Sequence, residues 1–203
     1  MNKVTGISAV VGILSFCWQN SATAITLEFS PSNQTSNLGS EVMFDLVISD
    51  LGNNIAPSLG EFDLILEFDS SIIAFDSLEF GEQLNQASST FAFRGETLVN
   101  ANALNLFEIS GELSSDLIQL QPSSFTLATF TFDSIGVGTS ELTLDNVILG
   151  DETGSSLSFL SESSSITVIS DVSTTVPEAS TIWALISFSL CSFFRYQRHT
   201  SRK

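Results

Sequence analysis

Carboxylates are the side chains through which this 203-residue sequence could do chemistry, and nearly all of them lie in one stretch. Of its 23 Asp and Glu residues, 22 fall between residues 25 and 176, where Arg94 is the one basic residue; 22 acids against one arginine give a formal charge of −21. The stretch has no Cys, His, Lys, Trp or Tyr. This excludes histidine bases, thiolate nucleophiles, Schiff-base lysines and Cys/His zinc sites from it. Nucleic acid is excluded as a partner, because neutralising phosphates needs a basic surface.

Calcium binding is the metal chemistry for which these side chains are suited. Ca²⁺ takes hard oxygen ligands, and Asp145, Asn146, Asp151 and Glu152 lie near a predicted turn. The spacing of an EF-hand loop is absent. We therefore interpret this stretch as an ordinary solvated acidic loop, with a calcium site as the alternative. No other cofactor is expected.

Catalysis is not predicted. A glycosidase needs two carboxylates at a suitable separation, and 22 of them give such pairs by chance. Clefts that process sugars usually also carry Trp or Tyr, which the stretch lacks, so we expect no enzyme and no catalytic residues. Its 13 phenylalanines are expected to fill the core, so polysaccharide binding would depend on hydrogen bonds from Asn, Asp and Ser. Arg94 is expected to form an ion pair with one of the many acids, and at an exposed site such a pair would contribute little.

The N-terminal residues have the three parts of a secretory signal peptide. Lys3 supplies the positive charge, residues 4–18 are largely apolar, and Ala22 and Ala24 are the small residues of a cleavage site. We predict a signal peptide over residues 1–24, with Ile25 the first mature residue. A buried N-terminal helix is the alternative.

The C-terminal residues indicate a second targeting signal. A short polar linker, 171–176, leads to the motif Pro177-Glu178-Ala179, and an uncharged run follows to residue 194. That run of 16 residues is shorter than the ~20 that span a bilayer comfortably. Basic residues close the sequence and would hold that end on the cytoplasmic side: Arg195, Arg198, Arg202 and Lys203.

The order of these three parts resembles the PEP-CTERM sorting signal of Gram-negative bacteria, here over residues 177–203. Ala179 stands where the third residue of that motif is usually proline. The resemblance implies an exported protein whose tail, a short transmembrane helix, is processed by an exosortase-type membrane enzyme. It also implies a place in the cell envelope, on the cell surface or in the extracellular matrix. A permanent tail anchor is the alternative.

Between these ends, residues 25–170 read as one all-β domain. Apolar and polar residues alternate with period two, which indicates strands with one buried face, and no stretch has a sustained helical pattern. In the run Phe125 to Phe132 the alternation changes phase, which predicts a bulge near Ala128. Short strands separated by turn residues are typical of an antiparallel sandwich or barrel. The strands are predicted at 25–29, 42–48, 62–68, 104–109, 125–132, 141–149 and 165–169.

The order of several segments resembles the cohesin domain. The early segments form an alternating strand, an aromatic-Asp turn, an aliphatic pair and a glycine, and the later ones continue the pattern. The resemblance implies a jelly-roll sandwich of about nine strands that binds calcium-loaded dockerin modules through one sheet face, with a fold related to certain carbohydrate-binding modules. The residues of that face are not placed by any short motif. The segments are 39–42, 60–69, 72–75, Gly81, 125–132, 138–144 and 151–154.

Two hypotheses follow for the function. The first is an exported, non-catalytic binding module that recognises a dockerin-type protein or a polysaccharide. The second is an acidic structural protein of an exopolysaccharide or biofilm matrix, without a discrete ligand. A strongly acidic surface suits both, because it keeps the domain soluble and attracts cations or basic partners.

Overall fold

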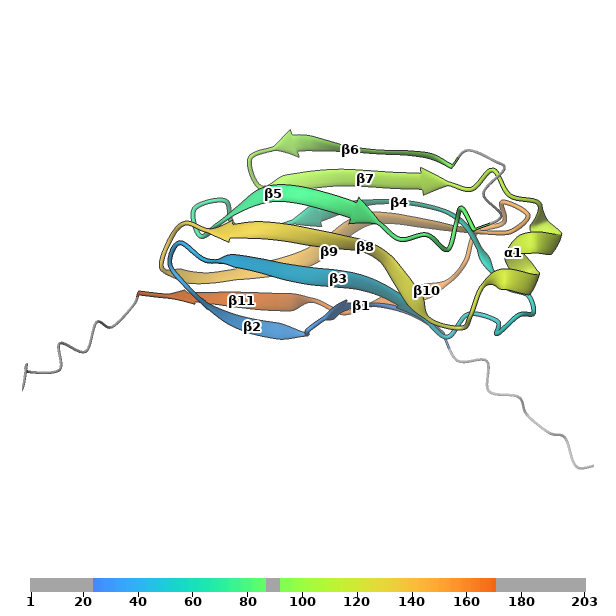
Figure 1. Ribbon diagram of the computed structural model, residues 1–203, viewed down its shortest axis with the longest axis horizontal. Coiled ribbons are helices and arrows are strands. Elements are labelled where there is room, and N and C mark those ends of the chain that lie inside the picture. The colour runs from blue at the N-terminus through green and yellow to red at the C-terminus, as the bar shows by residue number, and fades with distance from the viewer. Residues whose placement is uncertain (1–23, 87–91, 171–203) are drawn as a thin grey trace, which may run out of the picture.

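The computed structural model describes residues 24–86 and 92–170, which form two stacked β-sheets with a short helix at one end (Figure 1). Eleven strands and one helix follow one another in these residues. In chain order they are β1 (Ile25–Ser30), β2 (Asn33–Asn37), β3 (Glu41–Ser49), β4 (Leu59–Glu67), β5 (Ile73–Phe80), β6 (Phe93–Asn100), β7 (Ala103–Ile109), α1 (Ser114–Leu120), β8 (Phe125–Ser134), β9 (Gly138–Asp151), β10 (Phe159–Ser161) and β11 (Ser164–Ile169).

The first two strands and the last two strands of the fold are divided between the two sheets. The five-stranded sheet has the order β10-β1-β3-β8-β5, and the six-stranded sheet has the order β2-β11-β9-β4-β7-β6. The chain passes from one sheet to the other between β1 and β2, and again between β10 and β11. These strands pair with each other in parallel, β1 with β10 and β2 with β11. The expectation of a purely antiparallel sandwich is thus wrong at its first and last strands, which are joined by most of the chain and not by a hairpin.

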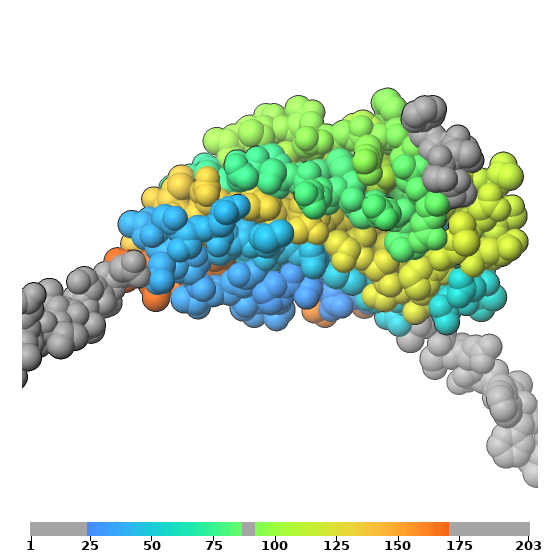
Figure 2. Space-filling model, viewed as in Figure 1, coloured from blue at the N-terminus to red at the C-terminus, as the bar shows by residue number. Residues whose placement is uncertain are grey.

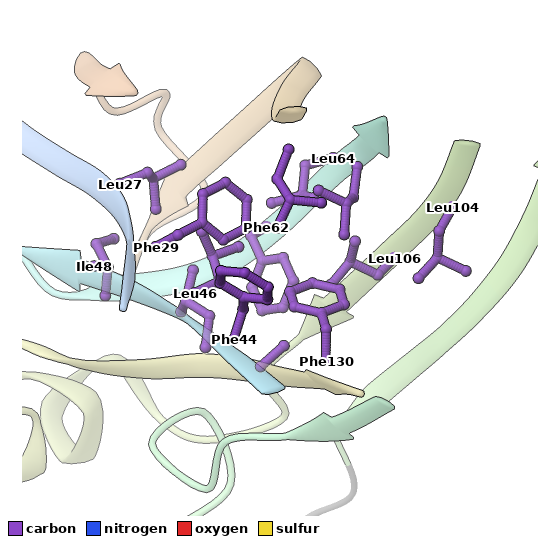
Figure 3. Packing of buried hydrophobic residues seen from close by; sticks show 14 of the residues in the cluster. Leu27, Phe29, Phe44, Leu46, Ile48, Phe62, Leu64, Leu104, Leu106 and Phe130 are labelled. Carbon is purple, nitrogen blue, oxygen red and sulfur yellow. The ribbon is translucent and has the colours of Figure 1, made fainter. Parts of the chain in front are cut away.

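The core lies between the sheets and is built by the alternation seen in the sequence. Every second residue of β3, β4 and β8 is buried, while the residues between them point outward. Figure 3 shows Phe44, Phe62 and Phe130 meeting in the middle of the sandwich. Burying one such side chain stabilises the fold by about 1.5–3 kcal/mol. Because residues 25–176 contain no cysteine, this packing carries the stability that disulfides give many exported domains.

All seven predicted strands are present, and the predicted bulge is confirmed. Leu46 on β3 lies opposite Ala128, but the next residue, Val47, lies opposite Thr126. Leu127 is therefore the extra residue of β8, and both Leu127 and Ala128 are buried. The bulge lets β8 bury two successive residues without losing its pairing with β3.

Four strands and the helix were not predicted. β2 is entirely polar, β6 is exposed over most of its length, and β5 and β10 lack a regular alternation of buried and exposed residues. All four lie at an edge of a sheet, where one-sided burial is weakest. In α1 only Leu117 is buried, so the helix has no apolar stripe that the sequence could reveal.

The predicted signal peptide, apart from Ala24, and the predicted sorting signal lie outside the described residues. This applies to Ala22, to the motif Pro177-Glu178-Ala179 and to the basic residues that follow it. Within the described ranges, no helix has the length and apolar character needed to cross a membrane.

Candidate protein-binding face

The outer faces of the two sheets differ in chemistry. The outer face of the five-stranded sheet is polar and rich in threonine, with Thr26 on β1 and Thr129 and Thr131 on β8 half-buried. The hydroxyl of Thr129 donates a hydrogen bond of 2.5 Å to Asp45 on β3. Figure 2 shows β3, β8 and β5 side by side on this face, with their side chains filling the surface. Apart from Met43 and Leu160, its exposed residues offer a partner little apolar area.

The outer face of the six-stranded sheet carries a row of apolar side chains instead. Phe93 on β6 lies opposite Ile109 on β7, while Asp63 on β4 lies opposite Phe107 on one side and Ile148 on the other. Phe93 is 68% exposed and Ile148 is 58% exposed. We call this the apolar row and define it as Phe93, Ile109, Phe107, Ile65 and Ile148. The row crosses four neighbouring strands, with Asp63 lying between Phe107 and Ile148. Exposed apolar patches of this kind mark interaction sites.

Two aromatic rings form one end of the row. The rings of Phe93 and Phe107 are tilted against each other with their centroids 5.3 Å apart. Gly95 lies opposite Phe107, and a Cβ at this position would come within 3.2 Å of that ring. The glycine therefore lets the ring of Phe107 lie close over the backbone of β6, and the two phenylalanines present a joint surface. Exposed aromatic residues are enriched at protein–protein interfaces.

Carboxylates lie around the row, and Asp63 lies within it. Glu61, Asp63 and Glu67 alternate along the outer face of β4, and Glu141 and Asp145 lie on the outer face of β9. The carboxylate of Asp63 accepts a hydrogen bond of 2.7 Å from the side-chain amide of Asn105, which fixes it beside Phe107. A partner that covers the apolar row would meet negative charge around it, so basic groups at the partner's rim would be favoured.

A shallow hollow of about 580 Å³ continues this face at the far ends of β4 and β9. Its walls include Glu67, Asp69 and Glu141, with Asn and Thr side chains between them. Asp69 accepts hydrogen bonds from the hydroxyl and the backbone N–H of Ser71, at 2.6 and 2.9 Å. These bonds, the hydroxyl bond first, lower the pKa of Asp69 below its ordinary value and keep it ionised. The hollow therefore extends the negative surface.

The four calcium candidates are divided between two places in the fold. Asp145 and Asn146 lie at a bulge in β9, where Asn146 has a φ of 49°, while Asp151 and Glu152 lie at and just beyond the end of that strand. Asp151 follows Asp145 by six residue steps along the strand, about 20 Å at the usual rise per residue. No cluster of three or more acidic, His or Cys side chains suited to a metal occurs among residues 24–86 and 92–170. A calcium site remains a prediction.

Asp151 and Glu152 already hold neighbouring loops in place. Asp151 accepts hydrogen bonds from the hydroxyl and N–H of Thr153, both 2.7 Å, and from the N–H of Ser155 at 2.9 Å. These bonds, led by the Thr153 hydroxyl, lower the pKa of Asp151. Glu152 accepts from the N–H and hydroxyl of Ser58, at 2.9 and 3.1 Å. Both carboxylates thus organise the end of the sandwich at which β4 begins.

Arg94 forms its ion pair with a buried partner, which the sequence did not predict. Glu108 points into the sandwich beside Leu106 and is 0% exposed, while Arg94 on β6 is 44% exposed. One guanidinium nitrogen lies 3.8 Å from the carboxylate, and the guanidinium carbon lies 5.3 Å from the ring centre of Phe80. Among residues 24–86 and 92–170, neither carboxylate oxygen of Glu108 has a hydrogen-bond partner. Burial raises the pKa of Glu108 to about 7, and the charge of Arg94 only partly offsets it.

Comparisons with solved structures identify the class of fold. The sixth cohesin of scaffoldin B from Acetivibrio cellulolyticus, solved in complex with a dockerin, superposes with a TM-score of 0.59 at 14% identity, over 72% of this chain and 100% of that one. The seventh type I cohesin of the scaffoldin from Pseudobacteroides cellulosolvens gives 0.58 at 14% identity, over 74% and 96%. A non-cellulosomal cohesin from the archaeon Archaeoglobus fulgidus gives 0.54 at 15% identity, over 73% and 92%.

The described residues therefore have the fold of a cohesin domain. No protein-family model and no curated protein matches the sequence. The likeness resides in the arrangement of strands, so function has to be argued from the side chains that this chain presents.

The sequence missed the residues of the candidate face. The expectation that all 13 phenylalanines fill the core is wrong for Phe93, which is exposed, and Phe107 is only half-buried. Both were overlooked because β6 was not recognised as a strand. Its register against β7, which brings the two rings together, could therefore not be predicted. The available signal was Phe93-Arg94-Gly95, an aromatic residue and a glycine two positions apart, which edge strands use to let a ring cover the backbone.

Proposed function

We propose that the protein is a non-catalytic binding module that recognises a dockerin-type protein through the outer face of its six-stranded sheet. The observation that carries the proposal is the apolar row framed by carboxylates on that face. Apolar anchors inside a charged rim are the usual anatomy of a specific protein interface. The fold supports the choice of partner, since similar structures include cohesins solved in complex with dockerins.

The charge of the domain supports a basic partner. Arg94 is the one basic residue between residues 25 and 176, and its guanidinium lies against Phe80 and Glu108. The face itself presents Glu61, Asp63 and Asp145 around the row. Lys or Arg side chains of the partner would steer the encounter, and the apolar row would slow dissociation.

We also propose that the chain is exported and that its tail is sorted by an exosortase-type enzyme to the cell surface or matrix. The sequences of residues 1–24 and 177–203 support this. Mass spectrometry of the mature protein tests it: an N-terminus at Ile25 and loss of the residues after the Pro177 motif are expected. A retained tail would favour the permanent membrane anchor.

Capture of partners from the secreted proteins and polysaccharides of the source bacterium tests the binding proposal. The immobilised protein is offered this material with calcium, with a chelator, and as the variant Phe93→Asp. A protein with duplicated calcium loops that is retained saturably, and lost both on chelation and with the variant, is expected.

Enriched polysaccharide would instead favour glycan recognition, for which the exposed rings of Phe93 and Phe107 offer a stacking surface. Absence of any saturable ligand would contradict both forms of the binding module and favour the acidic matrix protein without a discrete ligand.

A further inference from the structure

Of the four edge strands in the described sheets, β6 carries the most exposed apolar side chains, and its two charged residues are of opposite sign. β10 has three residues and β2 has five, all polar. β5 carries Asp76 and Glu79 and has a register irregularity between Phe75 and Ser77. Short length, charge and bulges are the devices by which proteins keep sheet edges apart. β6 has eight residues, regular pairing with β7 as far as Leu98, and exposed apolar side chains.

The edge is also open in space. Figure 1 shows β6 running along the rim of the molecule, with β7 on one side and no described element on the other. Phe93, Leu98 and Val99 on this strand are each more than half exposed. Its outward backbone groups are therefore available to hydrogen-bond an added strand, and its side chains would gain contacts in doing so.

The two charged residues of β6 are placed symmetrically about a glycine. Arg94 and Glu96 flank Gly95 and point to the same face of the sheet, since they lie opposite Glu108 and Leu106 of β7. If two copies pair antiparallel about a two-fold axis at Gly95, Arg94 of each copy lies opposite Glu96 of the other. Opposite charges directly across an antiparallel pair are stabilising, and like charges are destabilising.

This register is distinguished from its neighbours. Moving the axis by one residue toward Glu96 places the two Glu96 side chains opposite each other, and moving it toward Arg94 opposes the two arginines. In the register centred on Gly95, Phe93 lies opposite Thr97 of the second copy, an aromatic pair with a β-branched residue. The outer faces of the two six-stranded sheets then form one continuous surface.

We propose that β6 is a self-association edge through which two copies of this protein form an antiparallel β6–β6 pair centred on Gly95. The charges favour a second copy of this protein as the partner that pairs with the β6 edge. With a formal charge of −21 on residues 25–176, two copies repel each other wherever only carboxylates meet. Arg94 is the one cation in that stretch, and the β6 edge is where it meets a carboxylate of the second copy. The contact is isologous, so it closes as a dimer.

A single-cysteine variant tests the register. In the full chain with Cys17 and Cys191 replaced by serine, Gly95→Cys places two thiols directly opposite, within the Cα separation that a disulfide spans. The ring of Phe107, 3.2 Å from the added Cβ, has to shift by a few tenths of an ångström to accept it. Under mild oxidation we expect a covalent dimer of Gly95→Cys and little of Met43→Cys, an exposed control on the other sheet. Equal cross-linking of the two variants would overturn the register.

A charge variant tests the association itself without touching the core. Glu96→Arg puts two arginines opposite each other at each of the two Arg94–Glu96 contacts of the proposed dimer. Glu41→Arg makes the same change of charge at an exposed position of β3. By sedimentation velocity at about 100 µM, we expect the parent chain and Glu41→Arg to be dimeric and Glu96→Arg to be monomeric. A monomeric parent chain, or a Glu96→Arg variant that still dimerises, would refute the proposal. Co-purification of an extended segment from another protein with the monomer would assign the edge to that partner instead.

Discussion

At the scale of single residues, the structure assigns distinct roles to carboxylates that the composition treats alike. Asp69 and Asp151 accept hydrogen bonds from nearby hydroxyl and N–H groups and hold loops, and their pKa values are lowered. Glu108 accepts none, lies inside the sandwich, and has a pKa raised to about 7. Composition predicted the acidic surface, but it could not show that Glu108 is buried with a raised pKa. That difference depends on the register of β6 against β7.

Glu108→Gln is expected to flatten the dependence of stability on pH. In the folded protein Glu108 holds its proton up to about pH 7, whereas the unfolded chain releases it near 4.5. The contribution of Glu108 to the free energy of unfolding is therefore fully present below about pH 4.5 and is lost as pH rises through 7. The loss is on the order of 3 kcal/mol, from the size of the shift. Urea unfolding at pH 5 and pH 8 measures it.

The matched control for this prediction is Glu41→Gln, which changes an exposed carboxylate on β3. It should keep the decline in stability that the parent chain shows between pH 5 and pH 8. The shifts of Asp69 and Asp151 act below their ordinary pKa of 3.8, outside this range. If the free energy of unfolding of Glu108→Gln falls between pH 5 and pH 8 as steeply as that of the parent chain, Glu108 does not have a raised pKa in the folded protein.

At the scale of elements, the sequence pattern predicted the strands that bury one face. It did not predict the edge strands, in which few residues are buried. The alternation in β3, β4 and β8 is visible because inward residues are apolar and outward ones polar. β6 lies at the edge and is exposed over most of its length, so no such pattern exists in it. The cohesin-like order of segments was recognisable since it depends on the central strands. The candidate face could not be drawn, because it needs the register of an edge strand.

The side chain of Gln121 joins the short helix α1 to the start of β4. It is fully buried; its amide oxygen accepts from the N–H of Leu59 at 2.7 Å, and its amide nitrogen donates to the carbonyl of Leu59 at 2.7 Å. Gln121→Leu would leave both backbone groups unpaired and should destabilise the fold by about 2–4 kcal/mol. Chemical denaturation measures this, with the exposed Gln119→Leu as the control. Equal stabilities of the two variants would contradict the role of Gln121.

The bulge in β9 gives a second test at this scale. Asn146 has a φ of 49°, in the left-handed region that asparagine and glycine tolerate and β-branched residues do not. Asn146→Gly should leave the Tm nearly unchanged, whereas Asn146→Val should lower stability by about 1–2 kcal/mol. A valine variant as stable as the glycine variant would show that the backbone is not held in this conformation.

At the scale of the whole molecule, the fold presents two broad faces of unlike chemistry. One is polar and rich in threonine, and the other carries the apolar row within a rim of carboxylates. The sandwich supports both faces, because residues from each sheet pack together in its core. We propose that a protein partner docks on the face formed by β9, β4, β7 and β6, because the exposed apolar side chains gather there.

The affinity of the captured partner for matched surface variants tests this claim most directly. Phe93→Ala removes the most exposed side chain of the apolar row, and Met43→Ala removes an exposed apolar side chain of similar size from the opposite face. Calorimetric titration should show an affinity at least about tenfold weaker for Phe93→Ala, a loss of at least about 1.4 kcal/mol, and no change for Met43→Ala. If Met43→Ala weakens binding and Phe93→Ala does not, the partner docks on the five-stranded sheet and the account of the face is wrong.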